Sequence, residues 1–91
     1  MAFVSGTITI SSAGTPQRAA HKGNVRVIMF KARPANAANI YVGGPDVAAA
    51  DGMVLEPDDA VTLEFPEPIS TSQFYADADT SADAVDFIGV A

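Results

Sequence analysis

The sequence predicts an all-β protein, a small antiparallel β-sandwich or barrel-like domain with short strands. Three observations support this prediction. No stretch sustains the 3.6-residue apolar period of a helix, several short segments alternate apolar and polar side chains, and glycine, proline and aspartate separate those segments. The 91 residues suffice for a single β domain, 1–91. Cysteine is absent, so packing or association must supply the stability that disulfides give other small domains.

The N-terminal part, residues 1–24, is predicted to form an arm or a strand. Residues 3–10 are rich in β-branched side chains and alternate from Thr7 onward, which is typical of a strand. Residues 11–15 are expected to form a loop, residues 17–20 a short extended piece and residues 21–24 a turn.

Residues 25–33 form the strongest predicted strand. Ile28, Phe30 and Ala32 would share one face, while the other face carries Val27 and Met29 together with lysine and arginine. Neither face is wholly polar, so we expect either a central strand or one that a neighbour covers. Pro34 ends it, because proline cannot donate to a strand ladder.

The middle of the chain alternates short strands and turns. Residues 40–42 and 53–55 are predicted to be extended, and the Gly-Gly-Pro-Asp turn at 43–46 is expected to need backbone conformations that glycine adopts cheaply. Residues 47–51 are predicted to form one helical turn closed by Gly52. The turn at 56–59 has proline at its second position.

The last third is predicted to contain three strands, at 60–65, 72–76 and 84–90. The Pro-Glu-Pro at 66–68 should break the first of these, and residues 77–82 should form a polar turn. The predicted core combines the inward positions of the alternating segments: Ile28, Phe30, Ile40, Val42, Leu55, Val61 and Leu63.

Charge is divided along the chain. The net charge is −6, all five basic residues precede position 34, and all eleven acidic residues follow position 45. Two interpretations remain open: basic and acidic strands pair within one sheet, or the two halves form oppositely charged surfaces. In the second case, Arg18, Lys22 or Arg33 of one copy would contact Asp77, Asp79 or Asp83 of another, with Met29, Met53, Phe74 and Phe87 supplying apolar contact.

No residue pattern indicates an enzyme, a cofactor or a metal. His21 is the only histidine, and Ser11-Ser12 has no base nearby in sequence. Asp77, Asp79, Asp83 and Asp86 lack the glycine and glutamate of an EF-hand loop, which leaves cation binding by this segment open. We therefore assign no catalytic, cofactor-binding or metal-binding residue.

Three classes of partner are disfavoured. Gly43-Gly44 is not followed by the lysine of a phosphate loop, and the five basic residues form no recognisable nucleic-acid-binding module. No apolar run reaches the length of a membrane span, and the N-terminus lacks a basic start with a long apolar core, so we expect synthesis in a cytoplasm without a signal peptide.

Residues 25–65 carry a recognisable series of motifs. A strand with the sequence Val-Ile-Met-Phe-Lys-Ala (27–32) leads through an asparagine-containing loop (36–39) to Ile-Tyr-Val-Gly-Gly (40–44) and then to Leu-Glu-Pro-Asp-Asp-Ala-Val-Thr-Leu (55–63). The series resembles small β-sandwich proteins of phage virions, of the capsid cement, decoration or head-fibre type. Asp58 stands where that group usually has glycine.

The resemblance implies a non-enzymatic structural role. The expected protein is a capsid cement or decoration protein that binds the major capsid protein on the outer surface of a phage shell, as a homo-oligomer (trimer or dimer). A ligand that binds only the assembled shell stabilises it by mass action. The C-terminal segment 66–91 would contact the partner. The alternatives are a tail, neck or fibre component of the virion, or a host-surface binding module in which Tyr41 and Tyr75 could contact glycans.

Overall fold

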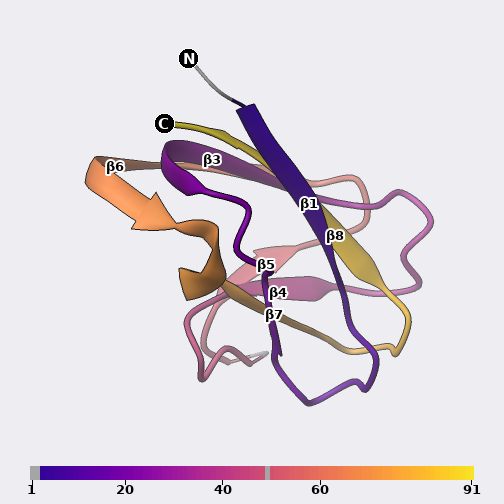
Figure 1. Cartoon of the computed structure of the whole chain (residues 1–91). Coiled ribbons are helices and arrows are strands. Elements are labelled where there is room, and N and C mark those ends of the chain that lie inside the picture. The colour runs from indigo at the N-terminus through magenta and orange to yellow at the C-terminus, as the bar shows by residue number, and fades with distance from the viewer. Residues whose placement is uncertain (1–2, 49) are drawn as a thin grey trace.

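The protein is a sandwich of two four-stranded antiparallel sheets, and the all-β prediction is confirmed (Figure 1). The computed structural model describes residues 3–48 and 50–91. Sheet A has the order β1-β8-β3-β6, and sheet B has the order β2-β7-β4-β5. The sheets are not closed into a barrel. None of the helices in the described part of the chain has the length and apolar character that a membrane crossing requires.

Sheet A is built from the four longest strands. They are β1 (Phe3–Thr9), β3 (Asn24–Ala32), β6 (Ala60–Ser70) and β8 (Ala84–Val90). β8 lies between β1 and β3, and Phe3 pairs with Val90, so the two ends of the described chain lie side by side (Figure 1). The predicted strand at 25–33 is β3, an interior strand that pairs with β6 and β8, and its side chains alternate because one face packs against the core.

Sheet B is made of shorter strands. It contains β2 (Gln17–Arg18), β4 (Ile40–Gly43), β5 (Met53–Leu55) and β7 (Tyr75–Ala78). A short 3₁₀ helix, η1 (Thr71–Gln73), connects β6 of sheet A to β7 of sheet B. Because β7 and β8 are interior strands of their sheets, segment 66–91 supplies much of the framework of the domain.

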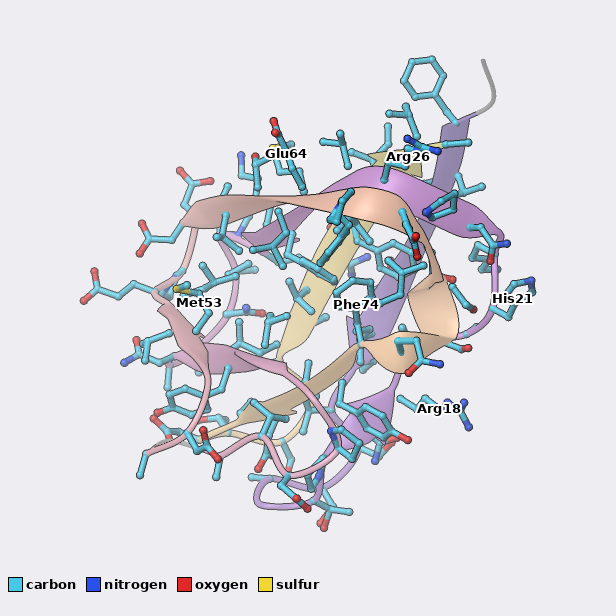
Figure 2. The ribbon with its side chains drawn as sticks, turned by 90° about the vertical axis from the view of Figure 1, so that its left-hand side faces the viewer. Arg18, His21, Arg26, Met53, Glu64 and Phe74 are labelled. Carbon is cyan, nitrogen blue, oxygen red and sulfur yellow. The ribbon has the colours of Figure 1, made fainter. Side chains whose placement is uncertain are left out.

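The core lies between the sheets and is centred on Phe30. The Phe30 ring has no solvent exposure and meets Phe74 at a centroid distance of 5.2 Å and Phe87 at 5.8 Å. Figure 2 shows Phe74 in the interior, between the sheets. Of the predicted core, Ile28, Phe30, Ile40, Val42 and Leu55 are buried. Val61 and Leu63 are only partly buried, because β6 is an edge strand of sheet A.

The helical turn predicted at 47–51 is wrong, and the strand predicted at 72–76 has other bounds. Of the residues 47–51 predicted to form a helical turn, those the structure describes (Ala49 is outside them) form a narrow turn, in which Ala48 and Asp51 exchange two backbone hydrogen bonds of 3.0 Å. Val47 is buried and anchors it. The predicted strand 72–76 begins as η1, because the Ser70 hydroxyl accepts from the Ser72 amide and caps a helical turn. The strand itself, β7, therefore runs to Ala78 and takes two residues from the predicted turn at 77–82.

The prolines of β6 interrupt pairing without ending the strand. β6 continues to Ser70, whereas the sequence predicted a break at 66–68. Its register against β3 shifts between Val25, which opposes Ile69, and Val27, which opposes Glu64. The residues between Glu64 and Ile69 form an irregularity at the edge of the sheet, where a missing proline N–H costs no ladder hydrogen bond.

Candidate functional site

His21 contacts the side chain of Ser70, and the described residues place no acidic group on this pair. Its Nδ1 lies 2.6 Å from the Ser70 hydroxyl, which in turn lies 2.8 Å from that of Ser72. The three groups are at the surface beside η1, and His21 points outward in Figure 2. The Ser70 oxygen serves as the cap of η1, so the contact stabilises the local fold. Ser11 and Ser12, the other serines considered, are exposed in the loop after β1.

The four C-terminal aspartates form hydrogen bonds with different parts of the chain. Asp77 and Asp83 are buried acceptors of backbone N–H groups, with Asp77 bonded to Gly14 and Ala78, and Asp83 bonded to Ala37 and Ala38. Asp79 accepts from the Tyr41 hydroxyl at 2.7 Å, a bond that raises the pKa of Tyr41. In the described part of the chain, no group of three His, Cys, Asp or Glu side chains could hold a metal ion.

Folding brings two of the five basic residues against acids from the second half of the chain. Lys31 forms an ion pair with Asp58 at 3.2 Å, and Arg33 pairs with Asp86 at 3.0 Å. Asp77 and Asp83, expected to meet another copy, are buried, which excludes them as surface contacts. The structure therefore favours pairing of basic and acidic strands within one chain over two oppositely charged surfaces.

The outer face of sheet A faces solvent but carries several large apolar side chains. Strand register aligns them in rows: Phe3, Val90 and Val27 form one row, and Ser5, Ile88 and Met29 form the next. The exposed fractions of Phe3, Met29 and Ile88 are 70%, 39% and 44%. We call the set Phe3, Val27, Met29, Ile88 and Val90 the apolar face.

Two shallow depressions indent the apolar face. One, of about 250 Å³, is lined by Phe3, Val27, Met29, Thr62, Ile88, Gly89 and Val90. The other, of about 200 Å³, adjoins Met29 and Ile88 and reaches Lys31, Asp86 and Phe87. A larger depression, of about 380 Å³, lies elsewhere, beside Tyr41, Asp77 and Asp79, and its polar groups already bond to one another or to the loop at Gly14. Three of the five large apolar side chains that the described structure leaves exposed lie on the apolar face, and the other two, Met53 and Val54, lie on β5.

A polar row borders the apolar face. Arg33 donates to both carboxylate oxygens of Asp86 at 3.0 Å, and the Thr7 hydroxyl donates to the same carboxylate at 2.6 Å. The hydrogen bond from Arg33 is the main cause that lowers the pKa of Asp86. Protein-binding surfaces commonly have an apolar centre and a polar rim. Here the charges of Arg33 and Asp86 at the rim neutralise each other.

Only some of the residues predicted to make contact with a partner lie at the surface. Met29 and Met53 are exposed as expected, but Phe74 and Phe87 are buried at 7% and 4% exposure and cannot supply an interface. Tyr41 is buried as well, which removes it as a glycan platform, and Tyr75 is half-buried. Sequence reasoning missed Phe3 and Ile88, although the mixed outer face of strand 25–33 was the signal that this side of the sheet is not purely polar.

Comparison with known proteins provides no relative. No protein-family model, no curated protein and no solved structure matches the chain.

Proposed function

We propose that this chain is a non-enzymatic structural protein of a phage virion, a cement or decoration protein that binds the outside of the capsid through the apolar face. The observation that carries the binding mode is the exposure of Phe3, Met29 and Ile88 together on the strands of sheet A. The virion assignment rests on the resemblance of residues 25–65 to phage structural proteins.

The composition of this surface supports a protein partner. Contiguous exposed apolar side chains with a polar rim mark interaction sites, because leaving them in water has a free-energy cost. The rim charges of Lys31, Arg33, Asp58 and Asp86 are paired within the chain. The partner therefore needs an apolar patch more than a complementary charge.

The first experiment measures the abundance of the chain in particles. Virions purified from the phage whose genome encodes the chain should contain it in a number of copies comparable to that of the major capsid protein, as quantitative mass spectrometry can determine. A few copies per particle would support the tail, neck or fibre role instead. Absence from the particle would overturn the virion assignment.

The second experiment tests the apolar face. Met29→Lys should abolish co-sedimentation of the purified protein with shells stripped of it, because a charge would be buried without a partner. Met53→Lys is the matched control, since Met53 is also an exposed methionine but lies on β5 of sheet B. Equal binding by both variants would exclude the apolar face as the contact.

A further inference from the structure

The free edge of β1 differs from the other three sheet edges. β1 pairs with β8 along all seven of its residues, Phe3–Thr9, and has no strand on its other side. Outside that pairing, no backbone hydrogen bond involves residues 3–9 in the described part of the chain. The N–H and C=O groups on this side are therefore open to pairing with a further strand.

The remaining edges are protected. β6 carries Pro66, Pro68 and two glutamates, β2 has two residues, and β5 has three and runs into Glu56-Pro57. Proteins commonly protect edge strands with prolines, charges, bulges or short length. β1 has none of these, since it contains neither proline nor a charged residue and its register against β8 has no shift.

We propose that β1 is a self-association edge, where two copies of this chain pair their β1 strands antiparallel and join two four-stranded sheets into one of eight strands. An edge strand is its own complement in this arrangement, because the same row of donors and acceptors is presented by both copies. The strand that pairs with β1 is that of a second copy rather than of a charged partner, because residues 1–17 have no charged side chain in a chain of net charge −6. Like-charge repulsion between copies is therefore weakest at this edge.

The two-fold arrangement has a consequence for the surface. Side chains directly opposite one another in an antiparallel pair point to the same side of the sheet. Phe3, Ser5 and Thr7 of both copies would therefore face the same side, which carries both apolar faces. The Lys22-Gly23 segment lies near Gly6 and Val4, whose side-chain positions alternate with those of Phe3, Ser5 and Thr7. The inference goes beyond the proposed function and holds whatever the apolar face binds.

Analytical ultracentrifugation of the purified chain without capsid shells tests the proposal. The wild type should show a concentration-dependent dimer, and the double variant Ser5→Lys, Thr9→Lys should sediment as a monomer, because it places like charges along both paired strands. Ser5 and Thr9 are exposed, so the variant should fold. The matched control, Met53→Lys with Val54→Lys, adds the same charges to exposed positions on β5 and should leave the dimer intact.

Hydrogen–deuterium exchange provides an independent measurement. The amides of β1 should exchange more slowly at high protein concentration than at low concentration, whereas those of β5 should not change. A monomer at every concentration, or a dimer lost in the β5 control but kept in the β1 variant, would overturn the proposal. Met29→Lys should still dimerise, so failure of shell binding and failure of self-association are separable.

Discussion

Left-handed backbone conformations fall on unexpected residues in this chain. Asp58 has φ of 74° at the third position of a turn closed by the Asp59 N–H and the Glu56 carbonyl at 2.9 Å, which is a type II turn with Pro57 at its second position. Aspartate tolerates this conformation better than most residues, which explains how it occupies a turn position that glycine often takes. Gly43 and Gly44, predicted to need such a conformation, do not adopt it.

Ala82 provides a direct test of the backbone strain. Its φ of 75° lies in a region that costs an ordinary residue roughly 1–2 kcal/mol. Ala82→Gly should raise the free energy of unfolding by about 0.5–1 kcal/mol, because relief of strain exceeds the entropy that glycine adds to the unfolded chain. Urea denaturation measures this. Ala35→Gly, at an exposed turn position without positive φ, should lower it by about 0.4–1 kcal/mol. Equal losses in both variants would contradict the strain argument.

At the scale of elements, the β3–β4 connection is held to the start of β8 by two polar side chains. The Asn36 amide donates to the Ala84 carbonyl at 2.8 Å and accepts from the Ala84 N–H at 2.9 Å, as a paired strand would. The buried Asp83 carboxylate accepts from the Ala37 and Ala38 amides at 2.9 and 3.0 Å. The loop from sheet A to sheet B therefore has a defined path despite its lack of regular structure.

Asp83 is expected to contribute more to stability than any exposed acid. Asp83→Ala leaves two backbone N–H groups without their charged acceptor, so the free energy of unfolding should fall by about 2–4 kcal/mol in thermal or urea denaturation. Asp46→Ala, at an exposed turn position, should change it by less than about 0.5 kcal/mol. Similar values for the two variants would mean that the Asp83 hydrogen bonds do not contribute to stability.

At the scale of the whole molecule, residues 3–10 belong to the sandwich itself. Of the two predicted alternatives for this segment, an arm or a strand, residues 3–9 form the strand. Ile8 and Ile10 have 2% and 0% exposure, and β1 pairs with the edge of β8 that does not pair with β3. A domain of this length buries a limited surface, so its free energy of unfolding is small. The loss of two core side chains would remove much of that free energy.

Deletion of residues 1–10 should therefore unfold the domain. Burying each isoleucine contributes on the order of 2–5 kcal/mol, and together they approach the whole stability of a small domain. Circular dichroism and thermal melting should show no cooperative transition for the truncated chain. The single variant Phe3→Ala, which removes only an exposed side chain, should melt like the wild type. A truncated chain with a native-like spectrum and transition would show that β1 is dispensable.

Local patterns were enough to predict the strands that pack against the core. Alternation identified residues 25–33 and the burial of Ile28 and Phe30, because one side of a strand in a sandwich must be apolar. The turn at 56–59 could also be predicted from local sequence, because proline restricts its own φ angle. These features depend on neighbours in sequence, so no tertiary information was needed.

Long-range pairing was decided only in three dimensions. The apolar face joins Phe3, Met29 and Ile88 from three strands that are neighbours in the sheet and distant in the chain, and the charged halves of the sequence meet as Lys31–Asp58 and Arg33–Asp86. The burial of Phe74 and Phe87 and the openness of the β1 edge depend on which strands pair. Many pairings of eight short strands satisfy the same local preferences, and only packing of the two sheets around Phe30 selects one.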